Sequence, residues 1–215
     1  MMPYIDTGEE DGGPLIRGVI FDFGNVISAF DVGKFLQRLN GWSGTGVETL
    51  RERIYGSGLH SRYERGDIPS EEFHREICRL SDARVPAEEF ADGFTDIFTP
   101  LESTHGLIRA LKGRYRLGLL SNTNEWHFER YIRNVPVFPL FDAVTLSYEV
   151  RALKPSPAIY RDALRKLSLP PQECVFIDDI PEYADGASAL GIRGIRFTGH
   201  DDLLRALSEL RVSVS

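Results

Sequence analysis

Gly18-Val19-Ile20-Phe21-Asp22-Phe23-Gly24-Asn25-Val26 is the stretch that decides the fold of this 215-residue chain. Its short apolar run is typical of a buried parallel strand, and the run ends on a carboxylate, Asp22. The carboxyl ends of parallel strands face the crevice in which open α/β sheets bind ligands, and Gly24 lets the chain turn sharply after the strand. Because Asp-x-Gly also closes many surface strands for turn reasons alone, the rest of the chain must decide between a site and a turn.

The second half of the chain alternates between helix and strand from Ser103 onward. Apolar runs predict strands over 116–120, 143–146, 174–177 and 193–197. Helical periodicity and end signals predict helices over 104–112, 125–133, 157–167 and 182–190, with a last helix striped by Leu203, Leu204, Leu207 and Leu210. Repeated βα units with right-handed crossovers predict an α/β protein with a doubly wound parallel sheet.

The segment 28–100 shows helical periodicity and no convincing strand. Val32, Phe35, Leu36 and Leu39 have the spacing of one apolar helix face, and Ser70 is expected to cap a later helix. We therefore predict an α/β core formed by residues 15–27 and 101–215, with a helical cap, 28–100, inserted after the first strand. Residues 1–14, which are acidic and glycine-rich, are expected to form a disordered leader.

Composition and charge exclude several classes of function. The net charge is −7, and the leader carries four of these negative charges, so no nucleic-acid or basic membrane surface is indicated. No apolar run is long enough to span a membrane and no signal peptide is evident, which predicts a cytoplasmic protein. Cys78 and Cys174, the two cysteines, are interpreted as buried apolar residues, not as a disulfide or metal pair.

Polar side chains gather at the carboxyl ends of the predicted strands, which all lie along one edge of the sheet. They are Asp22, Ser121, Asn122, Asp178 and Asp179, and Lys154 can reach the same edge from the loop before a helix. Each has a bland explanation as a turn or a helix cap. Together, however, three carboxylates in one crevice would repel one another unless a cation lay among them, as in a Mg²⁺ site.

These residues carry a family resemblance that covers nearly everything from Arg17 to Leu210. The chain resembles a hydrolase of the haloacid dehalogenase superfamily, in the phosphatase-like branch with a helical cap after the first motif. The similar motifs are Phe21-Asp22-Phe23-Gly24-Asn25-Val26, Leu120-Ser121-Asn122-Thr123, Lys154-Pro155 and Phe176-Ile177-Asp178-Asp179. The resemblance implies a Rossmann-like core and a Mg²⁺-dependent phosphomonoester hydrolase.

The implied roles agree with the chemistry of the residues. Asp22 would attack phosphorus and form an aspartyl phosphate that water later hydrolyses. Mg²⁺ would be held by Asp22, the Gly24 carbonyl and Asp179 as the principal ligands, with Asp178 beside them. Lys154 and Ser121 would donate hydrogen bonds to the phosphate oxygens, and the Asn122 amide is expected to donate there too. The expected substrate is a small phosphorylated metabolite such as a sugar phosphate.

One position departs from the family pattern. The second Asp of the family, which serves as general acid and base, is replaced here by Gly24, and that contribution is typically worth ~10²- to 10⁴-fold in rate. Three hypotheses follow. The substrate could have an acidic leaving group, the cap could supply the proton, or the protein could be an idle relative that binds a phosphorylated ligand or a partner. The expected donors in the second case are His60, Glu64 and Glu72, with His127 on the sheet side.

A 2-haloacid dehalogenase is a further alternative, but it needs no metal, so the Asp178-Asp179 pair counts against it. Substrate choice depends on the cap side chains that reach the crevice. The residues considered for that role are Arg62, Tyr63, Glu64 and Trp42. A monomer and a homodimer both remain open.

Overall fold

The structure, a computed structural model, describes residues 15–214, and the predicted leader 1–14 lies outside the described residues. Five parallel strands form the central sheet in the order β5-β4-β1-β6-β7. Their bounds are β1 (Gly18–Phe21), β4 (Arg116–Ser121), β5 (Ala143–Leu146), β6 (Cys174–Asp178) and β7 (Arg193–Arg196). The predicted doubly wound sheet is confirmed, and β1 lies at its centre.

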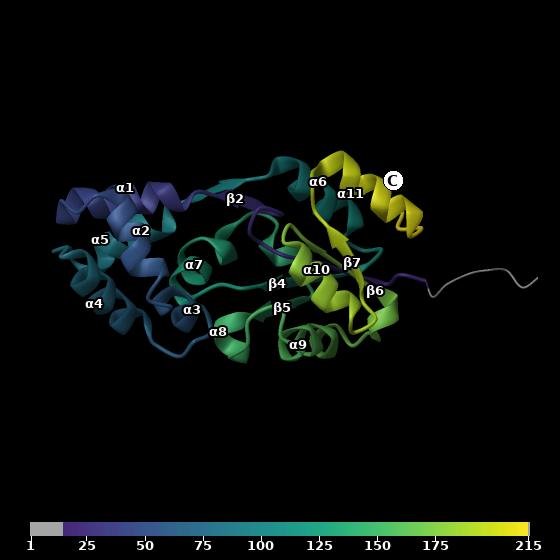
Figure 1. The fold of residues 1–215 in the computed structure, drawn as a ribbon. Coiled ribbons are helices and arrows are strands. Elements are labelled where there is room, and N and C mark those ends of the chain that lie inside the picture. The colour runs from purple at the N-terminus through teal and green to yellow at the C-terminus, as the bar shows by residue number, and fades with distance from the viewer. Residues whose placement is uncertain (1–14, 215) are drawn as a thin grey trace, which may run out of the picture.

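Helices cover both faces of this sheet (Figure 1). One face packs against α6 (Glu102–Leu111) and α11 (His200–Glu209), and the other against α9 (Pro157–Leu167) and α10 (Pro181–Ser188). The side chains of β1 alternate between these two layers, because Val19 and Phe21 join the first cluster and Ile20 joins the second. The connections contain α7 (Glu125–Arg130), α8 (Ser147–Val150) and three short 3₁₀ helices, η1 (Ile132–Asn134), η2 (Phe138–Leu140) and η3 (Pro171–Glu173).

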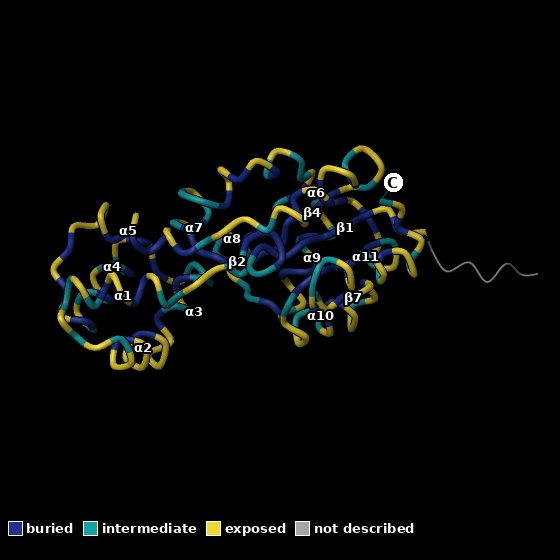
Figure 2. The backbone as a smooth tube through the Cα atoms, turned by 90° about the horizontal axis from the view of Figure 1, so that it is seen from above, coloured by how far each residue is buried: buried dark blue, intermediate teal, exposed yellow. Residues whose placement is uncertain are grey.

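A second apolar cluster belongs to the helices inserted after β1. These helices are α1 (Val32–Ser43), α2 (Val47–Tyr55), α3 (Leu59–Glu64), α4 (Ser70–Ser81) and α5 (Ala87–Thr95). Phe35, Leu36, Phe73, Ile77 and Phe90 lie fully buried among them. Figure 2 shows this buried region apart from the buried strands of the sheet. We call residues 28–100 the cap.

Two predictions for the cap were wrong. Its ends are not helical: β2 (Ser28–Phe30) and β3 (Phe98–Pro100) pair antiparallel and form its stem. Three-residue strands are too short to show an alternating pattern in the sequence. Ser70 is the first residue of α4 and not its cap, because its hydroxyl contacts the Tyr63 hydroxyl at 2.6 Å and donates to Glu125 at 2.5 Å instead.

The cap contacts the core a second time through α3. The Ser147 hydroxyl donates to the Glu64 carbonyl at 2.6 Å. Gly66 has a positive φ of 74°, and a Cβ there would lie 2.2 Å from the Tyr148 carbonyl oxygen, so only glycine allows this approach. The stem and this contact together hold the cap over the core.

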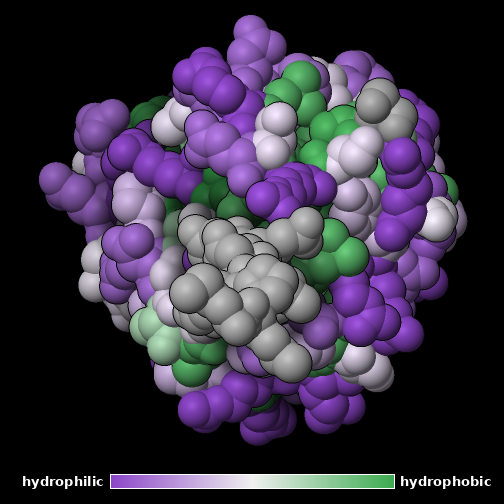
Figure 3. All heavy atoms as spheres, turned by 90° about the vertical axis from the view of Figure 1, so that its right-hand side faces the viewer, coloured by the Kyte–Doolittle hydropathy of each residue, from purple (hydrophilic) through white to green (hydrophobic). Residues whose placement is uncertain are grey.

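The end of the molecule away from the cap shows a mostly hydrophilic surface with hydrophobic side chains between (Figure 3). Within residues 15–214, the helices are too short or too polar to cross a bilayer. Cys78 and Cys174 are free thiols, and Cys174 is buried as predicted, whereas Cys78 is only half-buried.

Candidate active site

The predicted polar residues meet at the carboxyl edge of the sheet. Phe21 of β1 pairs in parallel with Leu119 of β4 and with Ile177 of β6, so the residues that follow these strands come level with one another. The Asp22 N–H donates to the Ile177 carbonyl at 2.9 Å, which continues the ladder by one residue and fixes the base of the Asp22 side chain. Asp22, Ser121 and Asp178 are all buried there.

Lys154 joins two of these carboxylates. Its Nζ lies 2.7 Å from Asp22 Oδ1 and 2.6 Å from Asp178 Oδ2. The Lys154 side chain is 1% exposed, so both ion pairs are shielded from water. The rings of Phe176 and Tyr183 lie 5.4 Å and 5.0 Å from Nζ and add cation–π contacts.

Asn122 holds the loop that carries Lys154. Its Oδ1 accepts from the Lys154 N–H at 2.8 Å, and its Nδ2 lies 3.4 Å from the Lys154 carbonyl oxygen. The expected donation from this amide to phosphate stays a prediction. What the contacts support is a positioning role for Asn122, because it ties the end of β4 to the lysine loop.

Burial and crowding shift the charges of the cluster. Burial is the largest effect on Asp22 and raises its pKa to about 7. The Lys154 ammonium lowers this pKa, and the Asp178 carboxylate raises it and so partly cancels the effect of the lysine. Burial likewise raises the pKa of Asp178 against the effect of Lys154. For Lys154, burial alone would lower the pKa, but the two carboxylates outweigh it and the pKa is raised. The lysine therefore stays charged, but its single positive charge is too little to stabilise the ionised forms of both carboxylates.

Three carboxylates form a cluster that fits a divalent cation. One oxygen each from Asp22, Asp178 and Asp179 lies within 4.8 Å of the others. Hard carboxylate oxygens are the donors that Mg²⁺ prefers, and a single lysine cannot balance three negative charges. Both oxygens of Asp178 already have partners, since Oδ2 faces Lys154 and Oδ1 accepts from the Ile180 N–H at 2.9 Å. This arrangement supports Asp179 as the principal ligand of the pair.

Asn25 is a site residue that the sequence reasoning missed. Its Nδ2 donates to Asp179 Oδ2 at 3.0 Å, across the sheet edge from β1 to β6. Asn25 has a φ of 54°, a conformation that Asn tolerates better than most residues. Its position directly after Gly24 in the first motif could have indicated a site residue. Its partner, Asp179, follows another strand and cannot be inferred from the local sequence.

A model of the haloacid dehalogenase-like hydrolases matches residues 16–191, which contain every residue of this cluster. The chain belongs to that family. The edge of the sheet that the family resemblance implied for the hydrolase thus carries Asp22, Ser121, Lys154 and the Asp178-Asp179 pair.

Similar proteins of the family include phosphatases. A D-ribitol-5-phosphate phosphatase from Bacteroides thetaiotaomicron is 26% identical over 172 residues, covering 77% of this chain and 84% of that protein. A phosphatase from Mycobacterium tuberculosis is 26% identical over 213 residues, covering 91% and 95%. A family enzyme from B. thetaiotaomicron, solved with magnesium and inorganic phosphate, has the same fold, with a TM-score of 0.75 at 24% identity over 84% of this chain and 93% of that chain.

A cavity of about 200 Å³ lies between the cap and the sheet edge of the hydrolase. Gly24, Ser121 and Asn122 line it from the core, directly beside the carboxylate cluster. From the cap and its stem, the lining is mainly aromatic and apolar, and includes Phe30, Phe35, Tyr55, Phe94 and Phe98. The polar exceptions from the cap are His60 and Glu64. The cavity would therefore enclose a compact group attached to a phosphate at the sheet edge.

Of the four residues considered for substrate choice, Glu64 alone is among the described residues that line this cavity. Tyr63 stacks on Phe73 with ring centroids 4.2 Å apart, inside the cap core. The Trp42 indole donates to Glu89, and Arg62 pairs with Glu72 at 3.7 Å. The aromatic lining was missed because its residues follow the helical apolar period, which does not distinguish a core contact from a cavity wall.

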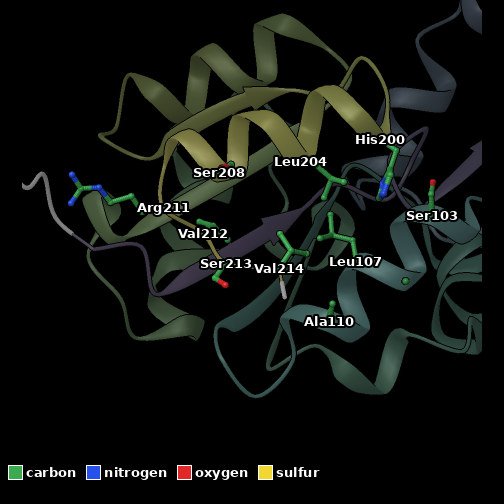
Figure 4. A pocket seen from close by; sticks show the side chains of 11 residues that line it. Ser103, Leu107, Ala110, His200, Leu204, Ser208, Arg211, Val212, Ser213 and Val214 are labelled. Atoms are coloured by element: carbon green, nitrogen blue, oxygen red, sulfur yellow. The ribbon is translucent and has the colours of Figure 1, made fainter.

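A separate groove between α6 and α11 takes no part in this site (Figure 4). Leu107, His200 and Leu204 face it, together with Val212 and Val214 near the end of the chain. The described residues that line it include no carboxylate, and it shares no residue with the cavity under the cap. We assign no role to this groove.

Proposed function

We propose that this hydrolase is a Mg²⁺-dependent phosphomonoesterase that works through an aspartyl phosphate on Asp22. The observation that carries the proposal is the buried cluster of Asp22, Lys154, Asp178 and Asp179, in which one lysine faces more carboxylate charge than it can balance. Such a cluster is costly to bury, and a bound divalent cation would balance its excess carboxylate charge. The similarity to phosphatases supports the same reaction class.

The first step transfers the phosphoryl group to Asp22. An oxygen of its carboxylate forms a bond to phosphorus in line with the leaving oxygen, whose bond to phosphorus breaks with both electrons. Lys154 has three N–H donors, and two are directed at Asp22 and Asp178, so the third can donate to a phosphate oxygen. The Ser121 hydroxyl, at the end of β4, would donate to another phosphate oxygen.

Asp22, Asp179 and the Gly24 carbonyl would hold the metal, with Asp178 beside them. When bound, Mg²⁺ supplies positive charge that offsets the repulsion between the Asp22 carboxylate and the phosphate. Asn25 would keep Asp179 oriented toward that position through its 3.0 Å hydrogen bond. In the second step, water attacks phosphorus, the bond to Asp22 breaks, and inorganic phosphate leaves.

The substrate that we propose is a small phosphorylated metabolite, such as a sugar or polyol phosphate. The cavity of about 200 Å³ supports a compact leaving group. Apolar C–H faces of a sugar or polyol could pack against the aromatic walls while hydroxyl groups reach His60 and Glu64. The similarity to a D-ribitol-5-phosphate phosphatase makes ribitol 5-phosphate the first compound to assay.

Phosphate release from a panel of phosphomonoesters tests the proposal. The panel contains ribitol 5-phosphate, sugar 1-phosphates and p-nitrophenyl phosphate, each with Mg²⁺ and with excess chelator. We expect release that requires Mg²⁺ and that falls at least ~10³-fold in Asp22→Asn. Asp201→Asn, an exposed aspartate in α11, is the matched control and should behave like the wild type.

Two results would overturn the proposal. Chloride release from 2-chloropropionate, unaffected by chelator, would indicate a dehalogenase. No release from any ester, with the protein folded and Mg²⁺ binding detected by calorimetry, would indicate a relative that binds phosphorylated ligands without turnover.

A further inference from the structure

An aromatic ring crowds the place that a side chain at position 24 would need. A Cβ built on Gly24 would lie 3.0 Å from Phe30 Cε1 and 3.4 Å from Phe30 Cδ1. Phe30 belongs to β2 in the cap stem and lines the cavity beside Gly24. The site is therefore built around the absence of a side chain at position 24. A side chain that protonates the leaving oxygen would therefore lie on another element.

Two of the four candidate donors are excluded, Glu72 by its position and His127 by its hydrogen bonds. Glu72 lies outside the residues that line the cavity and pairs with Arg62 at 3.7 Å. His127 does line the cavity, but its Nδ1 lies 3.1 Å from Asn124 Nδ2, and its Nε2 is 3.2 Å from the Phe94 carbonyl oxygen that it donates to. Burial lowers the pKa of His127 to about 3, so its ring is neutral and both nitrogens are engaged.

His60 and Glu64 remain, and they form a pair one helical turn apart on α3. His60 Nδ1 lies 3.5 Å from Glu64 Oε2, and their side chains are 22% and 20% exposed. Both line the cavity that also contains Gly24 and Ser121, so the pair faces the sheet edge across the space where a leaving group would lie. With Nδ1 directed at Glu64, Nε2 is the ring nitrogen left to meet a ligand.

The surroundings of the pair favour a charged imidazole. Burial would lower the pKa of His60, but the Glu64 carboxylate and its hydrogen bond outweigh this effect and raise the pKa above its usual value. Tyr55 of α2 faces the ring at 5.5 Å, and burial raises its pKa to about 12, so it stays neutral. His127 acts on His60 from α7, and Lys154 acts on Glu64 from the core. The His60 ring therefore keeps its proton to a higher pH than an ordinary histidine does.

We infer that His60, oriented by Glu64, is the general acid and base that replaces the missing carboxylate at position 24. The inference rests on the proposed phosphomonoesterase function. As the bond from phosphorus to the leaving oxygen breaks, the His60 Nε2 proton passes to that oxygen and the alcohol departs. In the second step, the neutral ring takes a proton from the attacking water, which restores the imidazolium.

Two substrates of similar shape test this role. Phenyl phosphate and p-nitrophenyl phosphate both suit an aromatic cavity, but the nitrophenolate leaves readily without a proton and the phenolate does not. We expect His60→Gln to lower kcat for phenyl phosphate by about 10²-fold and for p-nitrophenyl phosphate by less than about 5-fold. His74→Gln is the matched control, since His74 lies in the same cap on α4 and is not among the lining residues.

The pH profile supplies a readout that a structural role would not move. The wild type should lose activity toward phenyl phosphate as pH rises through the pKa of His60, and this alkaline limb should be absent from His60→Gln. Glu64→Gln removes the carboxylate that raises the His60 pKa, so it should move the limb to lower pH while the ring remains. Circular dichroism of each variant shows whether it is folded.

The outcomes separate this inference from the proposed function. Equal losses for both substrates in His60→Gln, or an unchanged limb in Glu64→Gln, would overturn the role of His60, while Asp22-dependent release by the wild type would still support the phosphomonoesterase. Absence of release from both esters by the folded wild type, with Mg²⁺ bound, would overturn both.

Discussion

The two walls of the cavity differ in almost every physical respect. On the core side, Gly24, Ser121 and Asn122 line the cavity. Directly beside them lie the buried charges of Asp22 and Asp178, at strand ends fixed in register, and of Lys154 from the loop before α9. The cap wall presents aromatic side chains around one ion pair, and these residues come from four cap helices and from the two short strands of the stem. This difference suits the core wall to the phosphoryl transfer that we propose. The cap wall is suited to recognising the leaving group and, if His60 is the acid, to protonating it.

Removing Lys154 from the core side of the site should have the largest effect on activity and stability. Lys154→Met leaves two buried carboxylates without their shared cation, so we expect activity to be lost and the free energy of unfolding to fall by about 3–5 kcal/mol. Urea unfolding at pH 7 and phosphate release measure the two quantities. The matched control is Lys112→Met, because the Lys112–Asp142 pair is substantially exposed and should contribute about 0–1 kcal/mol. A similar change in both variants would contradict the importance of burial.

Asn25 offers a milder test of the core wall. Asn25→Gly retains the positive φ but removes the amide that donates to Asp179. Because partners of a ligand tune metal affinity, we expect the Mg²⁺ concentration for half-maximal hydrolysis of p-nitrophenyl phosphate to rise about 10-fold, with kcat at saturating Mg²⁺ little changed. An unchanged Mg²⁺ requirement would show that Asp179 is oriented without Asn25 or is not a ligand.

His127 of α7 ties the core to the cap through the Phe94 carbonyl, and its buried ring should make the stability of the protein depend on pH. Its pKa is lowered to about 3 in the folded protein, so between that value and the usual 6.5 the unfolded chain binds the extra proton. Folding stability due to His127 is therefore complete above pH 6.5 and is lost as pH falls, by up to about 1.4 kcal/mol per pH unit. Urea unfolding between pH 7 and pH 4 should show a shallower pH dependence in His127→Gln than in the wild type. Parallel curves would mean that His127 titrates alike in both states.

Local signals in the sequence were sufficient for the core. Strand β5 was predicted over its observed bounds, Ala143–Leu146, and β4 and β6 extend only one residue beyond prediction, to Ser121 and Asp178. Parallel βα units leave little freedom, because strands that run in the same direction all place their carboxyl ends at one edge. The convergence of Asp22 and Asp178 could therefore be predicted from strand ends, and that of Lys154 from the loop that precedes a helix at the same edge.

The cap shows what local signals cannot supply. The stem strands β2 and β3 pair residues about 70 positions apart, as in Ser28 with Pro100, and a three-residue strand carries no period of its own. Serine often caps helices, but the Ser70 hydroxyl contacts Tyr63 and Glu125 instead. Only the fold brings these two residues close to it.

Local patterns along the chain were enough to predict the type of sheet, the carboxylates and lysine at its edge, and the absence of a side chain at position 24. Only the tertiary structure decided that Phe30 fills the space beside Gly24, that Asn25 holds Asp179, and that His60 and Glu64 face the site while Glu72 does not. The physical reason is distance along the chain. Strand ends follow from local periodicity and crossover rules, whereas the cavity is made by side chains from separate helices, whose packing depends on the whole molecule.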